Sequence, residues 1–300
     1  MSSTMTPSPS NPQAPADAPG AEPSLRERYA QVKARIAAAA KRAGREPSSI
    51  ILVAVTKNAE PDQIRELIQL GQVDLGENRV QQLTQRAAII GEWLGRARTI
   101  PGVSHARPGP ADTILAASRP ARADSPSSPG VRWHMIGHLQ RNKARKVVEL
   151  CRLVHSVDSL RLAEELQMIA QRREHPVEIL LQVNCSGEES KFGCAIGAAV
   201  HLAEQIETMI QVKVRGLMTM APLEGGLDAA RRTFRRCREL FEDIASSGAV
   251  SRDFNILSMG MSGDFDVAIE EGANLVRVGS SLFGAPRAGE TDDAGTEEPD

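Results

Sequence analysis

A lysine follows directly on a strongly apolar stretch of this 300-residue sequence. Residues 51–55 read Ile-Leu-Val-Ala-Val, and Thr56 and Lys57 come immediately after them. An unbroken apolar run of this length is typical of a parallel strand that is buried on both faces. An amine at the end of such a strand is partly desolvated, which favours its neutral, nucleophilic form. Lys57 could therefore attack a carbonyl carbon and form a Schiff base, although a solvated surface charge is the alternative.

Two segments rich in glycine and serine have the composition of a phosphate-binding site. They are SMGMSGD at residues 258–264 and RVGSSLFG at residues 277–284, and each joins a strand-like run to a helical one. Glycine lets backbone N–H groups approach a ligand closely, and serine hydroxyls add donors for phosphate oxygens. Ordinary turn chemistry is the alternative for either segment alone.

Arg277 is a charged residue inside the apolar run NLVRVG. A buried guanidinium needs an acceptor, which would be a carboxylate such as Glu77 or a group on a ligand. Glu77 and Asn78 end another strand-like run, and His134 lies within the run RWHMIG. We expect His134 to be a hydrogen-bonded core residue, because no carboxylate at a fixed offset completes a metal site around it.

Eight strand-like runs, most of them followed by an amphipathic helical pattern, would position these residues. The runs cover residues 51–55, 73–75, 132–136, 153–157, 177–183, 212–218, 254–257 and 275–278. This alternation predicts an α/β fold with a single (β/α)8 barrel, in which phosphate binds after strands seven and eight. An open, doubly wound sheet is the alternative. An extra helix over residues 24–43 precedes the first strand, and we expect it to cross the bottom of the barrel.

Three segments lack the large apolar residues that a packed core requires. Residues 1–23 are expected to be a disordered tail, and residues 287–300 a disordered acidic tail. Between them, residues 24–286 would form one domain, interrupted by a low-complexity insertion at residues 97–130.

The composition argues against several classes of protein. Lys and Arg number 36 against 38 Asp and Glu, so neither nucleic acid nor an anionic membrane is an expected partner. The four cysteines show no C-x-x-C or zinc spacing, which fits free thiols in a reducing compartment. The sequence has no run of about 18 apolar residues and no signal-peptide pattern. We therefore expect a cytoplasmic protein whose partners are small molecules or proteins.

The candidate residues together indicate pyridoxal 5′-phosphate as a cofactor. Lys57 after the first strand would hold it as a Schiff base. Arg277 in the eighth strand would face the pyridine nitrogen, and the two glycine- and serine-rich segments would bind the phosphate.

These motifs also resemble those of a known family. VAVTKN, LGENRVQ, WHMIGHLQRNK, VHSVDS, QVNCSGEESKFG, RGLMTMAP, LSMGMSGDFDVAI and VRVGSSLFG span residues 52–284 in the order of the pyridoxal phosphate homeostasis proteins. That family is also known as the proline synthase co-transcribed family. The resemblance implies a barrel of the alanine racemase N-terminal type. It places cofactor contacts on Lys57, Asn78, Met261, Ser262, Arg277, Gly279 and Ser280, where residue 280 is a serine in place of the family's frequent threonine.

The function that this resemblance implies is binding of pyridoxal phosphate in intracellular vitamin B6 and amino-acid homeostasis, without robust catalytic turnover. Such a protein would be a monomer or weak dimer, with pyridoxal phosphate-dependent apoenzymes as candidate partners. A pyridoxal phosphate-dependent amino-acid racemase or related enzyme is the alternative function. Against it, the one tyrosine of these 300 residues, Tyr29, is expected at the bottom of the barrel, where it could not serve as a second base opposite Lys57.

Overall fold

The computed structural model describes residues 22–97, 130–188 and 190–284. The predicted tails at residues 1–23 and 287–300, and the predicted insertion at residues 97–130, lie almost wholly outside these ranges. Those three assignments therefore stay predictions.

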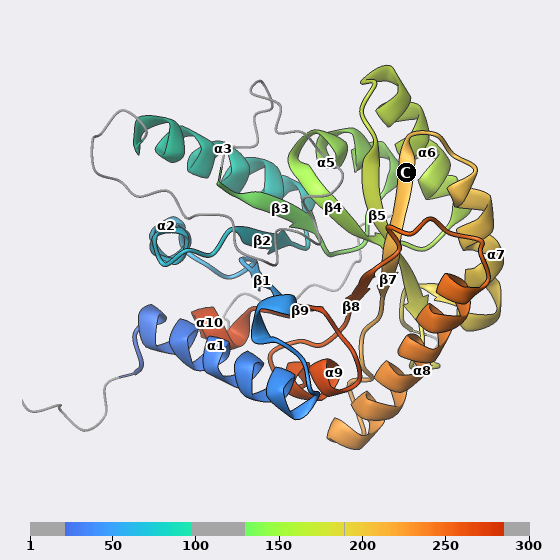
Figure 1. Ribbon diagram of the computed structural model, residues 1–300. Coiled ribbons are helices and arrows are strands. Elements are labelled where there is room, and N and C mark those ends of the chain that lie inside the picture. Colours follow the sequence, from blue (N-terminus) through green and yellow to red (C-terminus); the bar gives the residue numbers. More distant parts are fainter. Residues whose placement is uncertain (1–21, 98–129, 189, 285–300) are drawn as a thin grey trace, which may run out of the picture.

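The strands of the described residues form a closed parallel barrel (Figure 1). Strand β1 pairs with β9, Ile51 lying opposite Leu275, and β4 pairs with β5, so the sheet closes on itself. The predicted (β/α)8 barrel is confirmed, and the alternative of an open sheet is wrong. A two-residue strand, β6 (Cys194–Ala195), adds to the end of β5. The barrel strands are β1 (Ile51–Val55), β2 (Asp74–Glu77), β3 (Arg132–Met135), β4 (Cys151–Val157), β5 (Val177–Asn184), β7 (Val212–Met218), β8 (Ile256–Ser258) and β9 (Leu275–Val278).

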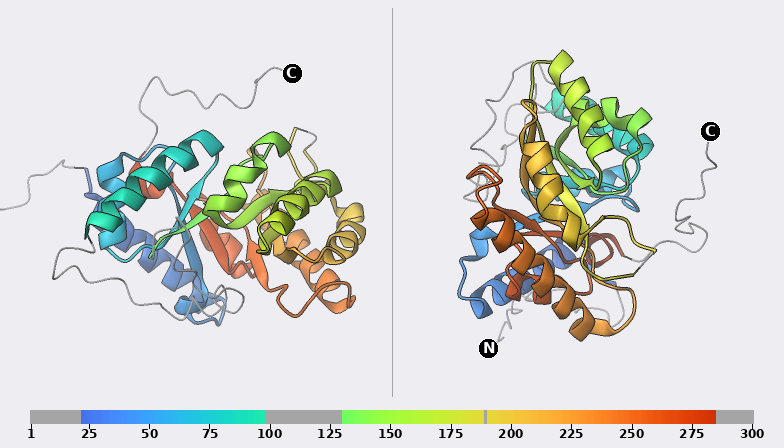
Figure 2. Two further views of the ribbon diagram at one scale, coloured as in Figure 1. Left: turned by 90° about the horizontal axis from the view of Figure 1, so that it is seen from above. Right: turned by 90° about the vertical axis from the view of Figure 1, so that its right-hand side faces the viewer.

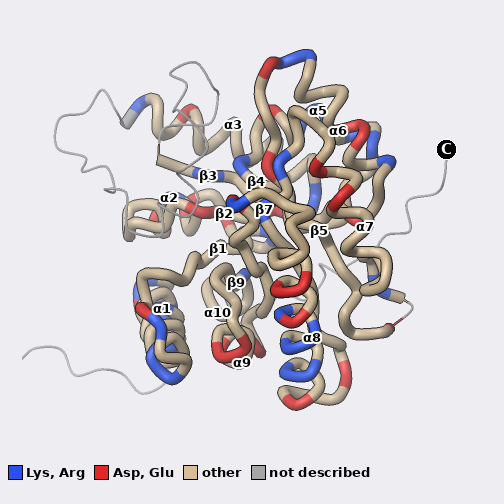
Figure 3. The backbone as a smooth tube through the Cα atoms, turned by 45° about the vertical axis from the view of Figure 1, so that its right-hand side comes forward, with Lys and Arg blue, Asp and Glu red and all other residues tan. Residues whose placement is uncertain are grey.

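Helices surround the barrel on its outside (Figures 1 and 2). The larger apolar core lies between strands and helices, and a smaller cluster that includes Val53, Leu180 and Met218 fills part of the barrel interior. Charges of both signs lie along the outer helices, as on α8 (Figure 3). The helices are α1 (Leu25–Arg42), α2 (Pro61–Gln69), α3 (Val80–Ala97), α5 (Ala144–Leu150), α6 (Leu160–Arg172), α7 (Ile196–Glu207), α8 (Gly226–Ser246), α9 (Phe265–Glu270) and α10 (Ser280–Phe283), with 3-10 turns η1 (Pro47–Ser49) and η2 (Arg141–Lys143). Within the described ranges, none of these helices combines the length and the apolar character needed to cross a membrane.

The amino-terminal helix α1 packs against the side of the barrel. Arg28 Nε donates a hydrogen bond to the Leu282 carbonyl of α10 at 2.7 Å, and Arg42 Nε donates to the Glu270 carboxylate of α9 at 2.7 Å. The helix that follows β9, α10, has only four residues, so α1 fills the place in the outer ring between α9 and α2. The prediction that this helix crosses the bottom of the barrel is therefore wrong.

Candidate functional site

The fold brings the seven predicted cofactor contacts to the same end of four neighbouring strands. The strand order is β8, β9, β1 and β2, and the carboxyl ends of parallel strands meet at one rim of the barrel. Lys57 follows β1 and Asn78 follows β2, while Gly279 is next to Val55 because β9 pairs with β1. In chain order the seven are Lys57, Asn78, Met261, Ser262, Arg277, Gly279 and Ser280.

The turn that carries Lys57 is held by an arginine from α3. Arg86 Nη2 donates to the carbonyl oxygens of Lys57 at 3.0 Å and Ala59 at 3.1 Å. Its Nη1 donates to Oε1 of Glu77 at 2.7 Å, and the Thr56 hydroxyl donates to the same carboxylate oxygen. These bonds fix the backbone around Lys57, whose side chain is partly exposed at the rim. No local pattern pointed to Arg86, because its partners lie on other elements.

Glu77 therefore does not pair with Arg277, an ion pair that the sequence analysis had considered. Side chains alternate along a strand, so Glu77 points outward to α3, as Leu75 points into the outer core. Asp74 and Gly76 face the barrel interior, where a Cβ on Gly76 would lie 2.8 Å from Val53. Burial raises the pKa of Glu77, and the neighbouring Arg86 and Thr56 offset part of that effect.

Arg277 lies inside the barrel and is held by neutral groups. Its Nη1 donates to Ser258 Oγ at 2.6 Å, and its Nη2 donates to the Thr219 carbonyl at 3.0 Å. Burial lowers the pKa of Arg277 to about 10, so the guanidinium is charged at neutral pH. Among the residues that the structure describes, no carboxylate bonds to it. A buried cation with further N–H donors favours an acceptor supplied by a ligand.

The two glycine- and serine-rich loops are joined through one hydroxyl. Ser262 Oγ accepts hydrogen bonds from the backbone N–H groups of Gly279 at 3.2 Å and Ser281 at 3.3 Å. Gly260 has a φ of +93°, and a Cβ there would lie 2.8 Å from Phe265 Cα, so glycine is required for this loop to pack on α9. An anion at this rim could accept from the same N–H groups and from the serine hydroxyls.

Asn78 carries an unsatisfied polar atom at this rim. Its Oδ1 is buried and has no hydrogen-bond partner in the described part of the chain. The loop after β3 approaches it closely, since a Cβ on Gly137 would lie 2.1 Å from the Asn78 carbonyl oxygen. A buried amide oxygen without a partner is costly, which is consistent with a ligand that completes its hydrogen bonds.

Met261 and Ser280 complete the predicted set, and both are exposed at the rim. The Met261 side chain is 38% exposed, and its backbone N–H donates to the Asp264 carboxylate at 2.6 Å. Ser280 opens α10. With the amine of Lys57 and the cation of Arg277, the rim suits a ligand that carries a carbonyl, an acceptor nitrogen and an anionic group.

A chain of hydrogen bonds that the sequence analysis missed runs from Arg277 across the barrel interior. Ser258 Oγ lies 3.0 Å from His155 Nδ1, His155 Nε2 lies 2.9 Å from His134 Nδ1, and His134 Nε2 lies 3.0 Å from Asp74 Oδ1. The prediction that His134 is a hydrogen-bonded core residue is confirmed, but Asp74, 60 residues away in the sequence, supplies the carboxylate beside it. The alternation of side chains along a strand could have predicted that Asp74 and His155 face the barrel interior. It could not have predicted that they belong to one hydrogen-bond chain. The described residues contain no group of His, Cys, Asp and Glu arranged to hold a metal ion.

Acidification is expected to destabilise the fold through His155. Burial, with His134 and Arg277 nearby, holds the pKa of His155 well below its ordinary value of 6.5. Below that pH the unfolded histidine binds a proton that the folded one does not, so stability falls as the pH falls. Urea unfolding from about pH 8 to about pH 5 should show that the free energy of unfolding falls by up to about 1.4 kcal/mol per pH unit below pH 6.5. His155→Gln should flatten that slope, and an unchanged slope would contradict the assignment.

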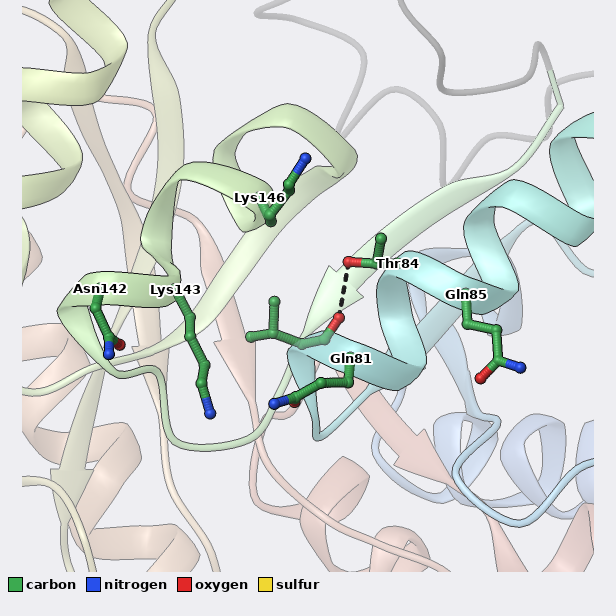
Figure 4. Close-up of a pocket in the computed structure, with 7 residues that line it drawn as sticks. Gln81, Thr84, Gln85, Asn142, Lys143 and Lys146 are labelled. Atoms are coloured by element: carbon green, nitrogen blue, oxygen red, sulfur yellow. Dashed lines mark hydrogen bonds between the residues drawn. The ribbon is translucent and has the colours of Figure 1, made fainter. Parts of the chain in front are cut away.

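A groove of about 450 Å³ lies between the start of α3 and the segment η2–α5 (Figure 4). The side chains of Gln81 and Lys143 extend toward one another across it. None of the seven predicted cofactor contacts lines this groove, so it is separate from the rim site. Its lining residues are Val80, Gln81, Thr84, Gln85, Asn142, Lys143 and Lys146.

Comparison with known proteins relates the whole barrel to one family. Residues 29–286 match the family model described as alanine racemase, N-terminal domain. The chain is 36% identical over 261 residues to the pyridoxal phosphate homeostasis protein of Pseudomonas aeruginosa, covering 87% of this chain and 95% of that protein. For the protein of the same name from Escherichia coli K12, the identity is 33%, with 85% and 94% covered. PipY of Synechococcus elongatus PCC7942, solved with PLP bound, superposes with a TM-score of 0.66 at 30% identity, covering 87% of this chain and 100% of that one.

Proposed function

This chain belongs to the pyridoxal phosphate homeostasis protein family, and we propose on that basis that it holds pyridoxal 5′-phosphate on Lys57. With the cofactor held there as a Schiff base, the protein acts in intracellular vitamin B6 and amino-acid homeostasis. The observation that carries this proposal most directly is Arg277, a buried cation without a carboxylate partner in the described residues, at the same strand ends as Lys57. The PLP-bound structure of a 30% identical relative supports the choice of cofactor.

Each candidate residue at the rim has a separate role toward the cofactor in this proposal. The bound cofactor supplies an aldehyde carbon and a conjugated ring that can accept electrons. Lys57 Nζ forms a C=N bond with that carbon, and the aldehyde oxygen leaves as water. Arg277 donates an N–H group to the pyridine nitrogen, and Asn78 supplies the amide whose Oδ1 lacks a partner.

The phosphate is held by the loops after β8 and β9. The hydroxyls of Ser262 and Ser280 and the N–H groups near Gly279 donate to its oxygens, and Met261 precedes the serine that links the two loops. In this proposal the protein is cytoplasmic, exists as a monomer or weak dimer, and delivers cofactor to pyridoxal phosphate-dependent apoenzymes. Its near balance of 36 basic and 38 acidic residues is consistent with small-molecule and protein partners.

The proposal is tested by locating the bound cofactor. Purified protein is incubated with pyridoxal phosphate, reduced with borohydride, digested and examined by peptide mass spectrometry. We expect the added mass on the peptide that contains Lys57, together with loss of the yellow colour. Labelling of another lysine in its place, or no labelling at all, would contradict the assignment.

Negligible racemisation is expected, in contrast to the racemase alternative. The Tyr29 hydroxyl donates to Gln72 Oε1 at 3.3 Å, and Gln72 Nε2 donates to the Leu52 carbonyl, so Tyr29 lies behind strand β1, outside the barrel. It therefore cannot serve as a second base on a substrate at Lys57. Arg277, as a donor to the ring nitrogen, would also keep that nitrogen unprotonated and weaken the ring as an electron sink.

The measurement follows chirality and α-deuterium incorporation for L-alanine and other L-amino acids in D₂O, with cofactor-loaded protein and an authentic alanine racemase as positive control. Turnover of about 1 s⁻¹ or faster, the low end of ordinary enzymes, that disappears in Lys57→Ala would establish the racemase alternative.

A further inference from the structure

The hydrogen-bond chain inside the barrel has a fixed donor at one end and a fixed acceptor at the other. At one end, the guanidinium of Arg277 can only donate, and at the other, the carboxylate of Asp74 can only accept. Burial alone would raise the pKa of Asp74, but hydrogen bonds from Arg132 and His134 outweigh it and lower that pKa, so the carboxylate is ionised. Arg132 donates to both of its oxygens, at 2.7 Å and 2.6 Å.

One arrangement that joins these two ends donates every proton toward Asp74. In it, Ser258 Oγ accepts from Arg277, and its own O–H is directed to Nδ1 of His155. His155 then carries its proton on Nε2 and donates it to Nδ1 of His134. His134 in turn carries its proton on Nε2 and donates it to Asp74. In this arrangement both histidines are protonated on Nε2 and accept at Nδ1.

Water has almost no access to the residues of this hydrogen-bond chain. Asp74 and Arg277 are each 4% exposed, and His134, His155 and Ser258 are each 0% exposed. Losing one link therefore leaves its neighbours without a substitute partner, which is the condition under which a hydrogen bond matters most.

No hydrogen-bond partner of Arg277 in the described residues carries a negative charge, and the Asp264 carboxylate, which raises the pKa of Arg277, acts on it without a hydrogen bond. A carboxylate in direct contact would neutralise the guanidinium and occupy its donors, as Asp74 does for Arg132. Ser258 and the Thr219 carbonyl hold Arg277 without a charge of their own. The carboxylate of the hydrogen-bond chain itself, Asp74, lies beyond two imidazole rings.

We propose that Asp74, His134, His155 and Ser258 are positioning residues, which orient the Arg277 guanidinium and keep its positive charge available to the pyridine nitrogen of the cofactor. They act through Arg277 and do not touch the cofactor. The role of these residues in cofactor binding rests on the proposed function. The direction of the hydrogen-bond chain does not depend on it.

The direction is tested on the protein without cofactor. Protein labelled with ¹⁵N-histidine is examined by NMR at neutral pH, and the two ring signals are assigned with His134→Gln and His155→Gln. Both rings should be protonated on Nε2 and carry no proton on Nδ1. An Nδ1–H tautomer or a cationic ring at His155 would show that the chain runs otherwise and would overturn the proposal.

The positioning role is tested with Ser258→Ala, which removes one hydroxyl and keeps the packing. Pyridoxal phosphate should bind about tenfold more weakly, since a hydrogen bond to a charged group is lost. The absorption spectrum of the bound cofactor should shift as well, because the environment of the ring nitrogen changes. Ser258→Thr, which keeps the hydroxyl, should restore part of the affinity and the spectrum.

Ser156→Ala is the matched control. Ser156 lies on β4 beside His155, is fully buried, and its hydroxyl has no hydrogen-bond partner among the described residues. Its removal should change neither affinity nor spectrum. Asp74→Asn, at the far end of the chain, should shift the spectrum in the same direction as Ser258→Ala, and it carries the test alone if Ser258→Ala does not fold.

The outcomes separate this inference from the proposed function. If wild-type protein is labelled on Lys57 while Ser258→Ala and Asp74→Asn bind cofactor with unchanged affinity and spectrum, the positioning role is wrong and the proposed function stands. If wild-type protein is not labelled on Lys57, the proposed function fails, and the tautomers in the cofactor-free protein still decide the direction of the chain.

Discussion

Lys57→Ala is expected to abolish the covalent retention of pyridoxal phosphate. The side chain supplies an amine at the rim between Asn78 and the phosphate-type loops, on strand ends that neighbour each other in the barrel. Without it no C=N bond can form there, so borohydride should fix no cofactor, although weak reversible binding through Arg277 can persist. The measurement is cofactor mass retained per protein after reduction and denaturation.

Lys213→Ala provides the control for this experiment. Lys213 is an exposed lysine near the start of β7, at the opposite end of the barrel from the rim. Its removal should leave the retained cofactor at the wild-type level. Retention in Lys57→Ala equal to that in Lys213→Ala would show that another lysine carries the cofactor.

Arg86→Ala is expected to cost about 3–5 kcal/mol of stability near neutral pH, because it leaves a buried carboxylate without its cation. Glu77 is 0% exposed, and Arg86 is the partner that lies 2.7 Å from its Oε1. The variant also loses the two hydrogen bonds to the carbonyls around Lys57, so labelling of Lys57 should slow. Urea unfolding and the rate of borohydride-fixed labelling measure the two effects.

The loss in Arg86→Ala should depend on pH with a defined sign. Burial already raises the pKa of Glu77 in the wild-type protein, and removal of Arg86 raises it further. A carboxyl whose pKa is higher in the folded state contributes stability at low pH and loses it as the pH rises. The variant should therefore be closest to wild type at about pH 5 and furthest from it at about pH 8.

The double variant Glu77→Gln/Arg86→Ala removes the buried charge and should recover much of the loss, with little dependence on pH. If the single variant showed no pH dependence, or the double variant were no more stable than the single one, the unpaired Glu77 carboxylate would not be the cause.

Local patterns were enough to predict most strands and helices and the rim at which the candidate site residues meet. The run at residues 51–55 predicts β1 with the bounds that the structure has, since a buried strand needs only a local apolar pattern. Strand bounds shift by one or two residues where the pattern is weaker, as in β2, which continues through Gly76 and Glu77. Because parallel strands all point the same way, the positions of Lys57, Arg277 and the two loops on one rim followed from the strand assignments alone.

Which side chains contact one another depends on the folded barrel. Closure of the barrel depends on pairing between β1 and β9, more than 200 residues apart, which no local pattern reports. That closure also left a gap in the helical ring beside the short α10, and α1 fills it instead of crossing the bottom. The register of neighbouring strands sent Glu77 outward to Arg86 and Asp74 inward to His134. Periodicity identifies the face on which a side chain lies, but its partner is fixed only when distant strands are aligned, so the support of Arg277 was visible only in the folded barrel.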